Sequence, residues 1–129
     1  MGAWGTGSFE NDDAVGWVAG LEAVTPEELM RILVRAADDP EYLEAGPARV
    51  AVAAAEVVAV LNGSGAESAP AAVVEWAGRH ECTPELKAAA GRALERVRRN
   101  SEVKDLWMEA DGLNEWVVVM KELQARVEL

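Results

Sequence analysis

The amino-acid sequence predicts an all-α protein: a single compact domain of six or seven short helices around a central apolar helix at about residues 47–61. Three observations support this prediction. Twelve of the fourteen residues from Ala48 to Leu61 are apolar. Elsewhere, apolar residues recur at the three- and four-residue spacing of one helical face. No segment alternates like a strand, and no regular period indicates a helical solenoid.

The central helix is apolar on all sides and is interrupted only by Arg49 and Glu56. Such a helix cannot lie on a surface, so other helices must cover it. We expect Pro47 at its first position and a left-handed cap at Asn62-Gly63. The alternative is a membrane span, but that requires about 20 apolar residues, and this run is too short.

Residues 1–10 form a glycine-rich loop that carries two large aromatic residues, Trp4 and Phe9. Its glycines, including Gly5 and Gly7, permit backbone angles that other residues avoid. Because exposing a tryptophan and a phenylalanine would be costly, we expect the loop to fold back and bury both side chains.

A first helix follows, with Asn11 or Asp12 as its N-cap. Its apolar face is expected to consist of Ala14, Trp17, Val18 and Leu21.

Thr25-Pro26-Glu27-Glu28 predicts the start of a second helix, because threonine caps, proline suits the first position and Glu28 completes a capping box. Pro40 ends this helix. Residues 40–46 are expected to hold a loose turn. The residues expected to be buried here are Leu29, Ile32, Leu33, Ala36, Tyr42 and Leu43.

Four more helices are expected beyond the flexible linker at 63–70. The first spans about 69–79, and the second begins at Thr83-Pro84-Glu85. The third begins after Asn100 or Ser101, and the fourth spans about 113–127. Asp111-Gly112 separates the last two. Their expected apolar faces are Val73, Trp76 and Ala77; Leu86, Ala90, Ala93, Leu94 and Val97; Val103, Leu106, Trp107 and Ala110; and Leu113, Trp116, Val117, Met120, Leu123 and Val127.

The charge of the chain excludes one large class of partner. The formal net charge is −11, and no lysine or arginine precedes Arg31. Nucleic acid is therefore not an expected partner, since phosphate contacts require basic side chains. The one basic concentration lies at the end of a predicted helix, where it is expected to complement the helix dipole. It consists of Arg92, Arg96, Arg98 and Arg99.

The cysteine content and the N-terminal sequence predict a cytoplasmic protein without membrane contact. Cys82 is the single cysteine, so no internal disulfide can form and a reducing compartment is favoured. The first residues lack the basic and apolar regions of a secretory signal. The oligomeric state is left open.

Few residues are arranged for chemistry. His80 and Cys82 lack partners at a spacing typical of a metal site or a catalytic pair, so structural roles are favoured. Glu10, Asp12 and Asp13 could share a divalent cation with carbonyl groups of the glycine-rich loop, although helix capping explains them without a metal. The loop fits neither the dinucleotide fingerprint nor the P-loop, so no cofactor is predicted.

The opening sequence resembles the head motif of an uncharacterised bacterial family, a domain of unknown function. The matching pattern is Gly-x-Trp-Gly-x-Gly-x-Phe-x-Asn-Asp-x-Ala, followed by a tryptophan on the first helix. The residues that match it here are Gly2, Trp4, Gly5, Gly7, Phe9, Asn11, Asp12, Ala14 and Trp17. The similarity covers nearly the whole chain. It implies a single-domain, cytoplasmic bacterial protein and supplies no activity or catalytic residue.

Two interpretations of the head motif follow from its residue types. As a structural plug, Trp4 and Phe9 seal one end of the bundle, and Asn11 ties the loop to the first helix. As a recognition surface, the loop presents an aromatic anchor, for which Trp4 is the best candidate. We favour the plug.

For function, the sequence favours a non-catalytic protein-binding module that binds a basic protein partner. Bacterial immunity proteins and antitoxins are analogous in charge and size only. The alternative is a metal-dependent enzyme or metal-binding site at Glu10, Asp12 and Asp13.

Overall fold

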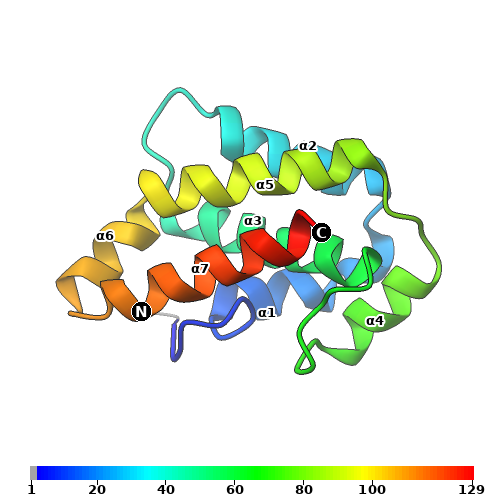
Figure 1. Ribbon diagram of the computed structural model, residues 1–129, viewed down its shortest axis with the longest axis horizontal. Coiled ribbons are helices and arrows are strands. Elements are labelled where there is room, and N and C mark those ends of the chain that lie inside the picture. The colour runs from blue at the N-terminus through cyan, green and yellow to red at the C-terminus, as the bar shows by residue number, and fades with distance from the viewer. Residues whose placement is uncertain (1–2) are drawn as a thin grey trace.

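The computed structural model describes residues 3–129, so Gly2 of the opening motif lies outside it. The predicted all-α fold is confirmed. The described residues form seven α-helices and one short 3₁₀ helix, joined by short loops (Figure 1). The elements are α1 (Asp12–Ala19), η1 (Leu21–Ala23), α2 (Pro26–Asp38), α3 (Ala45–Leu61), α4 (Ala71–Gly78), α5 (Pro84–Arg99), α6 (Glu102–Glu109) and α7 (Leu113–Val127).

Helix α3 is the central helix, as predicted, and it contacts each of the other six α-helices. Its alanines and valines are buried without gaps from Ala51 to Ala59, because small side chains let neighbouring helices approach closely. The helix begins two residues earlier than expected, so Pro47 is its third residue and not its first. Within residues 3–129, no helix is long and apolar enough to cross a membrane.

The end of α3 has the predicted left-handed cap. Gly63 has a φ of 78°, which favours glycine because a side chain there would strain the backbone. The Ser64 amide donates to the Ala59 carbonyl at 2.8 Å, and the Gly63 amide donates to Val60 at 3.0 Å. These two hydrogen bonds form a Schellman motif, which pairs carbonyls that the helix would otherwise leave free.

Helices α2 and α5 share a start signal and pack against each other on one side of α3 (Figure 1). Thr25 and Thr83 cap them, each hydroxyl accepting from the backbone amide three residues later at 3.1 Å. Proline follows each cap at the first helical position. These starts are as predicted.

Beyond the N-terminal loop, three residues expected to be buried are exposed instead. Tyr42 is 53% exposed, while its neighbour Leu43 is buried. The Tyr42 hydroxyl donates to Asp105 at 2.6 Å, which gives the side chain a polar partner at the surface. In α6 only Val103 is fully buried; Leu106 and Ala110 are exposed, because this short helix packs along a narrower face than its periodicity suggests.

The basic cluster at the end of α5 does more than complement the helix dipole. Arg96 donates to the backbone carbonyls of Asp39 at 2.6 Å and Glu41 at 2.7 Å. It thereby fastens the connection between α2 and α3 to α5. Arg92 forms an ion pair with Asp38 at the surface.

Candidate functional site

The N-terminal loop, residues 3–11, is closed on itself by backbone hydrogen bonds; we call it the head loop. Ala3 and Asn11 form an antiparallel bridge. Inside it, the Trp4 amide donates to the Glu10 carbonyl at 3.0 Å, and the Glu10 amide donates to Gly7 at 3.1 Å. The loop therefore has a defined shape despite its glycine content.

Two glycines of the head loop make room for the side chain of Glu10. The Glu10 carboxylate accepts from the Gly7 amide at 2.9 Å. A Cβ on Gly5 or Gly7 would come within 2.6 Å of this carboxylate and would displace it. Neither residue uses the positive φ that glycine permits. Their role is close approach, because a residue without a Cβ leaves the space that the carboxylate occupies.

The two aromatic residues of the head loop behave differently. Phe9 is partly buried and packs against the core, as expected. Trp4 is 60% exposed, so the expectation that it folds back into the bundle is wrong. The turn that brings Trp4 beside Glu10 leaves the indole on the outer side of the loop. Of the two aromatic residues expected to seal one end of the bundle, Phe9 packs against the core and Trp4 does not.

The start of α1 is held as the sequence predicts. Asn11 is the N-cap, and its Oδ1 accepts from the Ala14 amide at 2.8 Å. Asn11 is buried, whereas Asp12 is exposed in the first helical turn. Trp17 is partly buried against the core. These residues fasten the head loop to the helix that follows it.

The three carboxylates considered as metal ligands take separate roles. Glu10 accepts from Gly7, as described above, and Asp13 pairs with Arg49 at 3.2 Å. Asp12 is exposed in the first turn of α1. In the part of the chain that the structure describes, no three histidine, cysteine, aspartate or glutamate residues are placed to hold a metal ion.

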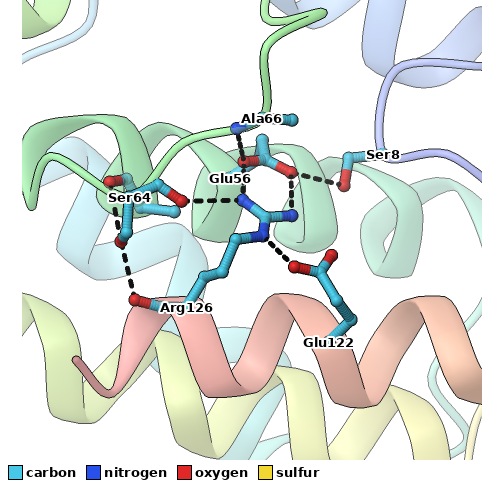
Figure 2. Close-up of polar contacts among 7 residues, drawn as sticks. Ser8, Glu56, Ser64, Ala66, Glu122 and Arg126 are labelled. Atoms are coloured by element: carbon cyan, nitrogen blue, oxygen red, sulfur yellow. Dashed lines mark hydrogen bonds and ion pairs between the residues drawn. The ribbon is translucent and has the colours of Figure 1, made fainter.

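A buried carboxylate lies beneath the head loop (Figure 2). The Glu56 side chain, on α3, is only 3% exposed. It accepts two hydrogen bonds from Arg126 on α7, at 2.7 Å and 3.0 Å, in the bidentate geometry of an arginine–carboxylate pair. It also accepts from the Ser8 hydroxyl at 3.2 Å and the Ala66 amide at 3.3 Å.

Arg126 is held from three further directions (Figure 2). Its guanidinium donates to Glu122 at 2.6 Å and to the Ser64 carbonyl at 3.0 Å, while its own carbonyl accepts from the Ser64 hydroxyl at 2.7 Å. The hydrogen bonds to Glu56 raise the pKa of Arg126 above its usual value, outweighing the opposite effect of burial. The guanidinium is therefore permanently charged.

The chemistry open to Glu56 is limited by these partners. Each carboxylate oxygen already accepts two hydrogen bonds, which uses its lone pairs. A cavity of about 310 Å³ adjoins the pair and is also lined by Phe9, Glu10 and Val119. With its acceptors occupied and an arginine against it, Glu56 is arranged as an anchor and not as a free general base.

Sequence reasoning identified Glu56 as an interruption of the central helix but did not find its partner. A glutamate that is enclosed by apolar residues needs a compensating charge. The sequence therefore indicated that Glu56 has a basic partner, but not which residue it is. Nothing local identifies Arg126, which lies 70 residues away on a helix with several charged positions.

His80 and Cys82 occupy structural positions. The His80 ring stacks on Trp76 at 4.0 Å, and its Nδ1 lies 2.8 Å from the Trp76 carbonyl. The Trp76 indole donates to the Val24 carbonyl at 2.9 Å. Burial raises the pKa of the Cys82 thiol, and Lys87 partly opposes this shift. A raised pKa disfavours the reactive thiolate.

The comparisons with known proteins identify one family. Residues 2–118 match the family described as Domain of unknown function (DUF4259). Because the match covers most of the chain, the protein belongs to this family, which confirms the resemblance to an uncharacterised domain. No curated protein and no solved structure matches the chain. Arg126 lies beyond the matched residues, whereas Ser8 and Glu56 lie within them.

Proposed function

We propose that this family member is a non-catalytic protein-binding module of the bacterial cytoplasm, and that it binds a basic protein through its head loop. Trp4 is the anchor of the proposed surface. Bacterial immunity proteins and antitoxins offer an analogy of charge and size for such a neutralising role.

One observation carries the proposal: a tryptophan that is 60% exposed on a loop that is otherwise tied down. Hydrogen bonds at Trp4, Gly7 and Glu10 close the loop, and Asn11 caps the following helix. Tryptophan is enriched among the residues that contribute most to protein interfaces. A loop held in one shape loses less conformational entropy on binding, so the exposed indole is available at low cost.

The charge of the protein supports a basic partner. The formal net charge is −11. Glu10, whose carbonyl accepts from the Trp4 amide, and Asp12, at the start of α1, are both exposed. Negative surface charge accelerates the encounter with a positive partner and weakens in salt.

The test is an affinity capture from an extract of the source bacterium at low salt, with three baits. Wild type is compared with Trp4→Ala and with Val74→Ala, which shortens another exposed apolar side chain on α4, away from the head loop (Figure 1). Thermal melting followed by circular dichroism checks that all three baits fold. The captured protein is then purified and titrated against each bait.

We expect a basic protein that binds wild type and Val74→Ala but not Trp4→Ala. Its binding should weaken strongly at about 1 M salt, where the Debye length is about 3 Å. Equal binding by Trp4→Ala, or the lack of any protein enriched at low salt, would contradict the proposal.

A further inference from the structure

Three segments that are distant in sequence meet at one buried carboxylate. Glu56 accepts hydrogen bonds from Ser8 of the head loop, from Ala66 of the connection between α3 and α4, and from Arg126 in the last turn of α7 (Figure 2). The separations from Glu56 are 48, 10 and 70 residues. The two ends of the chain are thus joined through a side chain of the central helix.

The Ser8–Glu56 hydrogen bond has a different role from the other polar contacts of the head loop. The contacts of Trp4, Gly7 and Glu10 with one another set the internal shape of the loop. Within the described residues, the hydrogen bond from Ser8 to Glu56 is the one that joins residues 3–10 to a helix of the bundle. Together with the packing of Phe9, it determines where the loop lies on the bundle.

The position of the Glu56 carboxylate depends in turn on Arg126. The guanidinium contacts both carboxylate oxygens, at 2.7 Å and 3.0 Å. This two-point contact fixes the plane of the carboxylate, and an ion pair with two hydrogen bonds is stronger than the single hydrogen bond from the uncharged Ser8 hydroxyl at 3.2 Å. Without it, a buried charge would turn towards water and would no longer face Ser8.

We propose that Arg126 is a positioning residue for the head loop: through Glu56 and Ser8 it holds the loop, and with it the exposed Trp4, in one place on the bundle. The consequence for partner binding rests on the proposed function, but the positioning itself does not. In this proposal, the place of the N-terminal loop on the bundle depends on the docking of the C-terminal helix, because Arg126 lies in the last turn of α7.

Hydrogen exchange of the head-loop amides tests the positioning, because a loop that is no longer held against the bundle opens its internal hydrogen bonds more often. Arg126→Gln removes the guanidinium, and Arg126→Lys keeps the positive charge beside Glu56 but lacks the two-point contact. Ser8→Ala cuts the link while leaving the buried ion pair in place. Glu122→Gln is the matched control, because it removes another partner of Arg126 without touching Glu56.

We expect the amides of Trp4, Gly7 and Glu10 to exchange about tenfold faster in both Arg126 variants and in Ser8→Ala than in wild type, and Glu122→Gln to match wild type. Amides of the buried faces of α2 and α5 report whether each variant is folded. Wild-type exchange of the loop amides in Ser8→Ala, or in either Arg126 variant whose α2 and α5 amides remain protected, would overturn the proposal.

Partner affinity separates this proposal from the proposed function. If the loop amides loosen and affinity falls in Arg126→Lys as in Trp4→Ala, both proposals are supported. If the loop amides loosen while affinity is unchanged, the positioning stands and the role of the head loop in binding is contradicted. If the loop amides are unchanged in the folded variants, the positioning is overturned, whatever the affinity.

Discussion

Two of the arginine–carboxylate pairs that join helices of this protein differ in their surroundings. Glu56 and Arg126 join α3 to α7 with side chains that are 3% and 19% exposed. Asp38 and Arg92 join α2 to α5 with side chains that are 57% and 52% exposed. The chemical groups are the same, but the first pair is buried and bidentate, whereas the second is exposed and makes one contact.

Because the first pair is buried, removing one of its partners costs much of the free energy of unfolding, although the intact pair contributes little net stabilisation. On folding, Glu56 and Arg126 lose their hydrogen bonds to water. They replace these bonds with their mutual contact and with hydrogen bonds to Ser8, Ser64 and Ala66. Removing one partner leaves a charge that the remaining hydrogen bonds compensate only in part. The exposed pair keeps its water throughout, so its loss changes little.

The largest effect is expected when a buried carboxylate has no partner at all. Val57 is adjacent to Glu56 in sequence and is fully buried. Val57→Asp should reduce the free energy of unfolding by about 4 kcal/mol or more, because it buries an unpaired charge and removes apolar contacts. Chemical denaturation followed by circular dichroism measures this loss, with Val57→Ala as the control for lost packing. A Val57→Asp variant as stable as wild type would contradict the burial of this position.

A somewhat smaller loss is expected when Glu56 keeps its place but loses its arginine. Arg126→Gln should cost about 3–5 kcal/mol of unfolding free energy, since it leaves the buried carboxylate unpaired. In a double-mutant cycle with Glu56→Gln, the combined loss should be smaller than the sum of the single losses. Additive losses would mean that the two side chains do not act as a pair.

The exposed pair should contribute little. Arg92→Ala should change the free energy of unfolding by less than about 1 kcal/mol, and added salt should reduce this change further. Denaturation at low and high salt measures both quantities. A loss as large as that of Arg126→Gln would show that exposure does not explain the difference between the two pairs.

The smallest effect is expected at a second exposed contact, between Tyr42 and Asp105. The hydrogen bond to Asp105, with smaller contributions from burial and nearby carboxylates, raises the pKa of Tyr42 to about 12. The unfolded chain loses this proton near pH 10, so any stabilisation from the contact is complete below about pH 10 and is lost as the pH rises towards 12. Tyr42 is the single tyrosine.

Absorbance of the phenolate therefore reports this one group. Its titration should have a midpoint near the raised pKa, and Asp105→Asn should shift it back towards about 10. Tyr42→Phe provides the blank. A wild-type midpoint near 10 would mean that the contact does not persist in solution.

Local signals in the sequence were sufficient to predict most helix boundaries. Thr25, Thr83 and Ser101 each accept a hydrogen bond from an amide three residues later. Gly63 ends α3 through bonds that reach back three to five residues. Contacts of this range depend on neighbours in the sequence, and they form in much the same way whatever the rest of the chain does. The family resemblance also followed from the sequence, and the family match over residues 2–118 confirms it.

The contacts that define the candidate site were decided by tertiary packing. Trp4 and Phe9 look alike in sequence, yet the closure of the head loop buries one against the core and leaves the other exposed. Glu56 signals only that a buried charge needs a partner. Arg126, 70 residues away, becomes that partner because α7 docks beside α3. Which side chain neutralises a buried charge depends on the three-dimensional arrangement of helices, and a one-dimensional pattern of apolar residues does not contain it.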